Sequence, residues 1–347
     1  HAVCGDNYIV TGQEVCDGTD LNGQDCTDYD YFNPSGLACN TTCSGFLISG
    51  CAASCGNVVE PGENCDQGNL TNGDGCSSTC QIEANWTCTA PMGGTSACTC
   101  QNHNACPIGR QCISGSCQTV AGDDCASPVD LTSATFPYSS TRDNSHLGSS
   151  ITSYTYQSAT TNVAGPDMFF KVTVSKDEYL VVEVESSLDL SIALLSSCAS
   201  GAVTPVRFAN RNGAGEIEQL HFQRTAFGTA NYFVVVQGIG LGDEGAFTIR
   251  MYRGTISNFG DGENVIITEM MIDLSGSDNL REWIEIYNNE NKAYNLANKA
   301  LQVNPGTPTS YYIGCNTSSA NCTPGTNGED VILRPQSYLL FAGSARA

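Results

Sequence analysis

The sequence predicts a mainly β protein, in which disulfide-rich N-terminal repeats are followed by two antiparallel β-sandwich domains. Three observations lead to this prediction. Sixteen of the 20 cysteines lie between Cys4 and Cys117. The rest of the chain consists of short apolar runs separated by turn-forming residues, and none of these runs has the periodicity of a helix.

The cysteine pattern divides the chain into a cross-linked front and a back of ordinary composition. After Cys117 only Cys125, Cys198, Cys315 and Cys322 follow. An even number of closely spaced cysteines is typical of a disulfide framework, which forms in oxidising compartments. We therefore expect a secreted, extracellular protein whose signal peptide was removed before residue 1. No run of 18 apolar residues occurs, which predicts that no segment spans a membrane.

The charge of the chain excludes nucleic-acid binding. Lys and Arg number 14 and Asp and Glu number 36, so the formal net charge is −22. Residues 1–124 hold 14 acidic groups and one basic group, Arg110, which gives −13 there and leaves −9 for residues 125–347. Phosphate recognition requires a basic surface. We therefore expect a partner that is neutral, cationic or a metal.

Residues 1–54 and 55–98 are predicted to be two copies of one six-cysteine unit. The second copy begins CGNVVEPGENCDQGNLTNGDGCSSTC at Cys55, and the first begins CGDNYIVTGQEVCDGTDLNGQDC and has an insertion before Cys39. This signature resembles the Myxococcus cysteine-rich repeat family, which implies a surface or secreted protein without catalytic residues in this region. The first copy departs from the pattern, with Thr11 where the second has Glu60. The pairing of the sixteen cysteines from Cys4 to Cys117 stays open, because spacing alone does not determine connectivity.

Each copy places short, oxygen-bearing side chains after its second cysteine. Oxygen ligands in a Gly-rich loop suit Ca²⁺, which takes about six to eight of them. Calcium is therefore the candidate cofactor, and its predicted ligands are Asp17, Asp20, Asp25, Asp66, Asn69 and Asp74. The alternative interpretation is that these residues form turns, with side chains bonded to the backbone two residues further on.

Residues 99–124 form a short module with four more cysteines, Cys100, Cys106, Cys112 and Cys117. The module is similar to small disulfide knots that follow such repeats in secreted bacterial proteins. We expect it to be a rigid spacer rather than a binding site.

Residues 125–255 are predicted to form the first sandwich, with a jelly roll as one form of it. Strands are expected at MFFKVTV (168–174), YLVVEVE (179–185), LSIALL (190–195), QLHF (219–222), NYFVVVQG (231–238) and AFTIRMY (246–252). These segments resemble the bacterial pre-peptidase C-terminal domain, which implies a non-catalytic module of a secreted protein. Cys125 and Cys198 are expected to form a disulfide. Loop carboxylates that could hold Ca²⁺, or simply be solvated, are Asp167, Asp189, Asp243 and Glu244.

Residues 264–347 contain the segment REWIEIYN and resemble the lamin-tail domain, which implies an immunoglobulin-like sandwich. The matching residues are Ile267, Glu269, Glu282, Trp283, Ile284, Glu285, Tyr287, Asn288 and Leu296. The resemblance implies that the three glutamates are structural rather than a catalytic pair. We expect Cys315 and Cys322 to staple a loop. The pattern stops before the sandwich is complete, so either the natural polypeptide continues or a neighbouring subunit supplies the missing strand.

No motif in the sequence indicates catalysis. The chain lacks a nucleophile elbow, a His-Glu-x-x-His segment and a phosphate-binding loop. We predict a non-catalytic structural protein of a bacterial cell surface, a subunit of a fibre, sheath or layer, with itself or other surface proteins as partners. The alternative is a calcium-dependent adhesin or carbohydrate-binding protein that takes glycans as partners. Its sugar-stacking candidates are Tyr29, Tyr31, Phe32, Tyr311 and Tyr312.

Overall fold

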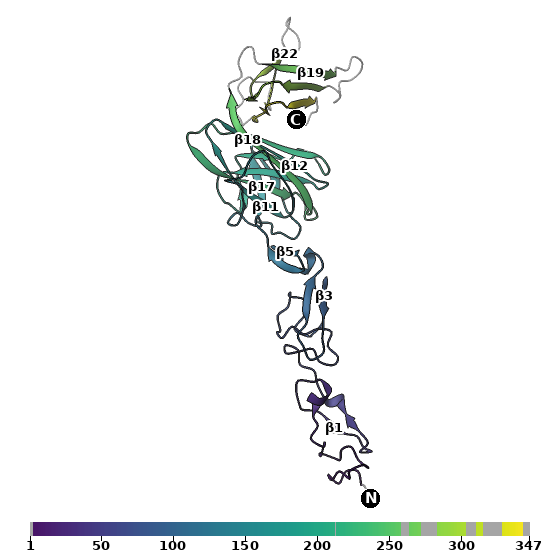
Figure 1. Cartoon of the computed structure of the whole chain (residues 1–347). Helices are drawn as coiled ribbons and strands as arrows, with labels where there is room; N and C mark the ends of the chain where they lie inside the picture. Colours follow the sequence, from purple (N-terminus) through teal and green to yellow (C-terminus); the bar gives the residue numbers. More distant parts are fainter. Residues whose placement is uncertain are drawn as a thin grey trace. The chain divides into compact units, whose positions relative to one another are not determined.

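In a computed structural model of the chain, residues 3–211, 213–257, 264–271, 283–302, 310–314 and 328–342 are described. The chain divides into two compact units, residues 1–119 and 120–347 (Figure 1). The helices of the described residues are all short 3₁₀ turns, η1 (Cys26–Tyr29), η2 (Ile48–Gly50) and η3 (His103–Ala105). None of them is long and apolar enough to cross a membrane. The prediction of a mainly β protein is therefore confirmed.

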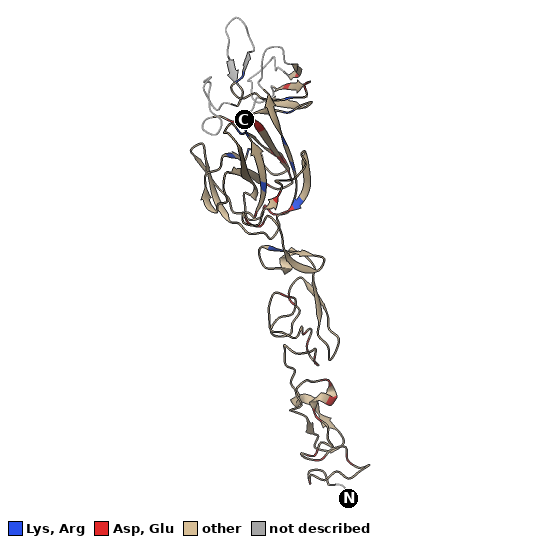
Figure 2. Ribbon diagram, turned by 60° about the vertical axis from the view of Figure 1, so that its left-hand side comes forward, with Lys and Arg blue, Asp and Glu red and all other residues tan. Residues whose placement is uncertain are grey.

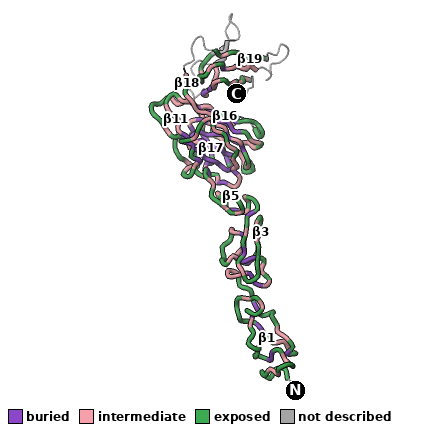
Figure 3. Tube along the Cα trace, in the orientation of Figure 1, coloured by how far each residue is buried: buried purple, intermediate pink, exposed green. Residues whose placement is uncertain are grey.

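The first unit consists of loops and three short hairpins. Its strands pair as β1 (Ala38–Cys39) with β2 (Phe46–Leu47), β3 (Trp86–Thr89) with β4 (Ala97–Cys100), and β5 (Arg110–Ile113) with β6 (Ser116–Thr119). Buried residues are scattered along this unit, whereas they form a continuous core in the strands of the second (Figure 3). Because so little apolar surface is buried, covalent links must supply much of the stability of the first unit.

Eight disulfides cross-link the first unit. They are Cys4–Cys43, Cys16–Cys39 and Cys26–Cys51 in the first copy, Cys55–Cys80, Cys65–Cys76 and Cys88–Cys98 in the second, and Cys100–Cys112 and Cys106–Cys117 in the spacer. The first two bonds of each copy correspond, but the third does not. Cys26 lies in the longer loop of the first copy, and Cys98 lies on β4. The predicted six-cysteine unit is therefore a shared four-cysteine unit with one additional, copy-specific disulfide.

Two facing sheets form the centre of the second unit (Figure 1). The first has the strand order β15-β13-β17-β11-β7, and the second has the order β16-β12-β18-β21-β24, with β8 also paired to β18. The bounds are β7 (Val129–Asp130), β8 (Tyr138–Asp143), β11 (Asp167–Ser175), β12 (Glu178–Glu185), β13 (Leu190–Leu195), β15 (Arg207–Ala209), β16 (Ile217–Gln223), β17 (Thr229–Gly238), β18 (Ala246–Ser257), β21 (Ala293–Asn295) and β24 (Ile332–Leu333). Every strand predicted between residues 168 and 252 lies inside one of these. The pairing is antiparallel except where β7 joins β11 and β21 joins β18.

A third layer covers the outer face of the first sheet. It consists of β9 (Ile151–Tyr156), β10 (Ala159–Asn162) and β14 (Gly201–Val203). Tyr154 packs there against Phe169 and Val235, while Phe170 and Val234 point into the core between the two main sheets. The continuous apolar runs of β11 and β17 follow from this arrangement, because both faces of each strand are buried.

The two predicted domains 125–255 and 264–347 share a sheet. Strand β18 continues to Ser257, and its last residues pair in parallel with β21. Ile332 of β24 and Ala293 of β21 pack against Tyr179 and Val181, on the outer face of β12. The remaining strands form small sheets of their own, β19 (Val265–Met271), β20 (Trp283–Asn288) and β25 (Tyr338–Ala342) in one, and β22 (Ala300–Gln302) and β23 (Ser310–Tyr312) in the other.

The sandwich also begins earlier than predicted, at residue 120 rather than 125. Val120 packs against the main core, and the amide of Phe169 donates to the carbonyl of Gly122 at 2.8 Å. Gly122 has a φ of +103°, and a Cβ there would lie 2.9 Å from Cγ of Met168. Residues 120–124 are therefore part of the sandwich and not of the spacer, because only glycine permits this close approach.

Candidate functional site

The predicted calcium ligand Asp66 binds backbone amides. Its side chain is fully buried, and it accepts hydrogen bonds from the amides of Gly56 at 2.8 Å, Asn57 at 3.0 Å and Gly68 at 2.6 Å. These donors present the positive ends of their dipoles to the carboxylate, which is the environment of an anchored anion. Asp66 therefore fixes the start of the second copy beside the Cys55–Cys80 bond.

Asp17 does the same in the first copy. It is fully buried, and the amides of Gly5, Asp6 and Tyr8 donate to its carboxylate, the last two at 3.0 and 3.1 Å. Burial raises the pKa of Asp17, but hydrogen bonds from the Gly5 amide and its neighbours outweigh burial, and the net pKa is lowered. The aspartate that follows the second cysteine is thus a structural anchor in both copies.

The other predicted ligands act mainly as turn formers. Asp20, Asp25 and Asn69 accept hydrogen bonds from the amides two residues further on, at 3.0, 2.7 and 2.6 Å respectively. Asp25 also caps η1, and hydrogen bonds from Thr27 lower its pKa. Asp17 and Asp20 are paired through two backbone hydrogen bonds of 2.8 Å. The side chains of Asn69 and Asp74 are joined by a hydrogen bond of 3.2 Å. These contacts are those of the turn interpretation, and calcium stays a prediction.

A carboxylate that sequence reasoning missed links the two copies. Glu60 is fully buried, and its carboxylate accepts hydrogen bonds from the backbone amides of Phe32 and Ser54, which both belong to the first copy. The bond from Ser54 is 2.5 Å long. Thr11 occupies the corresponding position of the first copy. That departure from the repeat signature was the available signal, because a group that joins neighbouring copies need not be present in each.

Replacing Asp66 by Ala should destabilise the second copy. Two half-buried amides, of Gly56 and Asn57, and the exposed amide of Gly68 would lose a buried acceptor, and the expected loss is about 2 kcal/mol of local stability. The matched control is Asn69→Ala, because that side chain is exposed and water can replace its contacts. Hydrogen exchange of the Gly56 and Asn57 amides in the non-reduced protein measures the effect. Equal protection in the two variants would contradict the anchoring role.

Carboxylates hold loops in the sandwich as well. The buried Asp167 accepts the amides of Ser150 at 2.8 Å and Ile151 at 3.0 Å, and its second oxygen, Oδ1, has no partner in the described structure. Asp243 accepts the amides of Gly240 at 2.7 Å and Asp189 at 3.3 Å. The four loop carboxylates of the prediction therefore do not form one cluster through these contacts.

Cation binding has few candidate groups. Every cysteine in the described ranges is oxidised, so the three Cys-containing groups with metal-like spacing offer no thiolate. Among the described residues, Asp74, Asp167 and Asp189 each have one buried carboxylate oxygen without a hydrogen-bond partner. A cation would gain most at Asp167, because that carboxylate is fully buried.

Asp167 should make the sandwich less stable as the pH rises from about 4 to 6. Burial is the main reason that the pKa of Asp167 is raised to about 6 from 3.8. The folded state therefore holds a proton that the unfolded state releases, and the free energy of unfolding falls through this window by about 3 kcal/mol. Asp167→Asn should abolish this fall, measured by urea unfolding in chelator at several pH values. Asp130→Asn is the control, because hydrogen bonds from Thr132 lower the pKa of the exposed Asp130 and Asp167 remains in this variant. The fall should therefore persist in Asp130→Asn.

A buried ion pair joins the sandwich to the C-terminal strands. Arg207 of β15 and Asp330 lie 2.5 Å apart, with side chains that are 9% and 4% exposed. The amide of Gln223 donates to Oδ2 of Asp330 at 3.1 Å, and Nδ2 of Asn295 donates to Oδ1 at 2.8 Å. Both oxygens are therefore bound, as a buried carboxylate requires. We call this group of four residues the seam.

Further polar contacts extend the seam along β16 and β12. The amide of Ile332 donates to Nδ1 of His221 at 2.8 Å, and burial lowers the pKa of His221 to about 4. Arg334 lies 3.1 Å from Glu183 and stacks on Tyr252, 3.6 Å from the ring centroid. The imidazole is neutral above that pKa, so it remains an acceptor at neutral pH. The seam is a fixed junction under those conditions.

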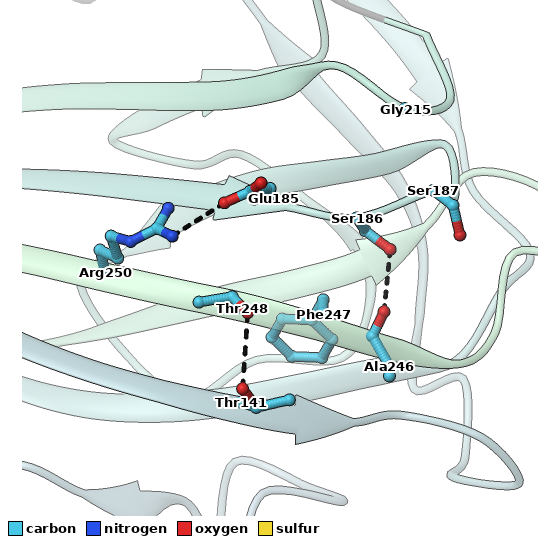
Figure 4. Close-up of a pocket in the computed structure, with 9 residues that line it drawn as sticks. All are labelled: Thr141, Glu185, Ser186, Ser187, Gly215, Ala246, Phe247, Thr248 and Arg250. Carbon is cyan, nitrogen blue, oxygen red and sulfur yellow. Dashed lines mark hydrogen bonds and ion pairs between the residues drawn. The ribbon is translucent and has the colours of Figure 1, made fainter.

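A shallow, polar recess lies on the second unit. Figure 4 shows its residues at one end of β12 and β18. Arg250 lies 2.8 Å from Glu185, and Oγ of Ser186 donates to the carbonyl of Ala246 at 3.0 Å. No nucleophile and base are paired among the residues drawn. The recess therefore has the character of an ordinary surface at the ends of two strands.

The remaining predicted residues are dispersed. Tyr29 and Tyr31 pack against the small core of the first copy, whereas Phe32 is 64% exposed. Glu285 accepts the hydroxyl of Thr268 at 2.7 Å, and Glu269 lies opposite it in the register. The predicted Cys125–Cys198 disulfide is confirmed. Outside the described residues or side chains lie Glu282, Tyr311, Tyr312, Cys315 and Cys322.

Comparison with known proteins identifies no family for the chain. No family model matches the sequence, and no curated protein matches it. Among solved structures, the chain is similar to a GH2 beta-galacturonidase from Eisenbergiella tayi, with 8% identity and a TM-score of 0.19. That match covers 52% of this chain and 28% of the enzyme chain. A similarity this low carries no inference about fold or function.

Proposed function

We propose that the chain is an exported, non-catalytic structural protein of a bacterial cell surface, and that it is a subunit of an extracellular fibre, sheath or layer. The observation that carries the proposal is the use of its buried carboxylates. Asp17, Glu60, Asp66 and Asp167 all accept backbone amides, and Asp330 completes the seam. These buried carboxylates, which in an enzyme could act as acids or bases, instead bind backbone amides and hold loops in place.

The cross-links and the charge support the same proposal. Nine disulfides in the described residues are consistent with an extracellular protein. Acidic residues are spread along the first unit, and Arg110 is the one Lys or Arg among residues 3–119 (Figure 2). Such a surface favours contacts to neutral or cationic partners and opposes contact with polyanions.

Assembly of the native, non-reduced protein tests the proposal. Negative-stain microscopy and light scattering should show regular fibres or sheets. A monodisperse monomer over the accessible concentration range would contradict the structural role. The same measurement in chelator tests the calcium prediction, because assemblies or melting temperatures that depend on Ca²⁺ require a bound cation. Identical results with and without chelator would remove calcium as a cofactor.

A further inference from the structure

A second recess lies where three segments of the second unit meet. They are the hairpin of β9 and β10, the end of β15, and Gly328 with Glu329 just before β24. The recess has a volume of about 400 Å³. Its main lining residues are Tyr156, Gln157, Phe208, Asn210, Arg211 and Glu329. Ligand sites favour such junctions, because side chains from separate segments can converge there.

Two aromatic rings in this recess are held in place. The hydroxyl of Tyr156 donates to Oε2 of Glu329 at 3.3 Å. The ring of Phe208 lies 4.8 Å from the ring of the buried Tyr154, with an interplanar angle of 30°. Tyr156 and Phe208 are half-buried, so part of each ring remains available to a ligand. Fixed rings bind an apolar face with little loss of side-chain entropy.

Hydrogen-bond donors and acceptors line the same recess. Nε2 of Gln157 donates to Glu329 at 3.3 Å and to the carbonyl of Gly328 at 3.0 Å, and Arg211 lies 3.5 Å from Glu329. Guanidinium, amide, phenol and carboxylate groups together offer both donors and acceptors. A ligand rich in hydroxyl groups matches this set, because each hydroxyl can donate and accept.

The charge of the recess favours a neutral ligand. Arg211 and Glu329 cancel each other, while the chain as a whole carries −22. A polyanion would be repelled by that surface, and a neutral ligand would not. Sugars combine hydroxyl groups with apolar C–H faces. We propose that this recess binds a hexose unit of a neutral polysaccharide, with Tyr156 and Phe208 against the ring and Gln157, Asn210, Arg211 and Glu329 around the hydroxyl groups.

This site goes beyond the proposed structural role, which requires no ligand, and the two can fail separately. The test uses the full, non-reduced chain. Neutral gluco-, galacto- and manno-oligosaccharides of several ring numbers are arrayed beside their uronic-acid counterparts, and bound sugars are then titrated by calorimetry. Tyr156→Ala should weaken binding of a neutral oligosaccharide at least about tenfold. Tyr156→Phe should bind nearly as well as the native chain, because the ring remains.

Arg250→Ala is the matched control, because it changes an arginine–glutamate pair in the recess of Figure 4, on the same unit. Its affinity should equal that of the native chain. If Tyr156→Ala melts early, Asn210→Ala gives the same test without removing a ring contact, and it too should weaken binding. The proposal is overturned if the native chain binds no neutral oligosaccharide, if it binds only the uronic-acid series, or if neither Tyr156→Ala nor Asn210→Ala lowers the affinity.

Discussion

Reduction of the native protein should unfold residues 1–119 and leave residues 120–347 largely folded. Eight of the nine described disulfides lie in the first unit, where buried apolar residues are few. Loss of a native disulfide from a small domain costs about 2–5 kcal/mol, so loss of all eight exceeds any stability that this unit can have. Limited proteolysis with mass spectrometry, before and after dithiothreitol, shows which residues become accessible.

The sandwich provides the internal control for that experiment. Its described residues contain one disulfide, Cys125–Cys198, and its buried core extends over both main sheets. Changing both cysteines to Ser should lower its melting temperature but leave a cooperative transition. Rapid digestion of the non-reduced first unit, or loss of the sandwich together with it on reduction, would contradict this division of stability.

Arg207→Ala should be the most damaging single substitution in the second unit outside its apolar core. It leaves the carboxylate of Asp330 buried without its cation, which costs about 3–5 kcal/mol. Urea unfolding measures this loss. In a Trp86→Phe background, Trp283 of β20 is the only tryptophan and reports the C-terminal strands directly. The fluorescence midpoint should therefore move to lower urea.

Two further variants identify the origin of the loss. Asp330→Ala should cost a similar amount, and the double variant should cost clearly less than the sum, because the two groups act as a pair. Glu185→Ala breaks the exposed pair with Arg250 and should cost at most about 1 kcal/mol. If Arg207→Ala behaved like Glu185→Ala, the seam would contribute no more than a surface contact.

The strands that the sequence predicted are those with runs of apolar residues. MFFKVTV and NYFVVVQG lie within β11 and β17, because strands buried on both faces must be apolar throughout. The sequence ITSYTY of β9 was missed, since its hydroxyl-bearing residues outnumber its apolar ones. The sequence analysis also missed that β21 and β24 pack on the outer face of β12. Both alternating sets of residues in β12 are apolar, and Tyr179 and Val181 could therefore have indicated a second buried face.

The sequence indicated which kinds of residue form the candidate sites, but it did not indicate what those residues bind. Asp17 and Asp66 were predicted as calcium ligands, and in the structure both carboxylates accept hydrogen bonds from backbone amides. The composition of a loop does not distinguish an oxygen that binds a cation from one that binds amides. Arg207 and Asp330 are separated by 123 residues, and no local pattern connects them. The recess around Tyr156 has the same origin, because its residues meet only after the C-terminal strands join the sandwich.

The order of the disulfides also determines how the first unit responds to a pulling force. Cys4 and Cys43 are separated by 39 positions and enclose the 38 residues between them, so tension applied at the two ends passes through the sulfur–sulfur bond and bypasses that loop. Without the bond, those residues would lengthen to about 130 Å when fully extended. The second copy behaves alike, because Cys55 and Cys80 are separated by 25 positions and their bond removes the 24 residues between them from the path. The unit should therefore lengthen little under tension until its disulfides are reduced, as the proposed role of a structural subunit would require.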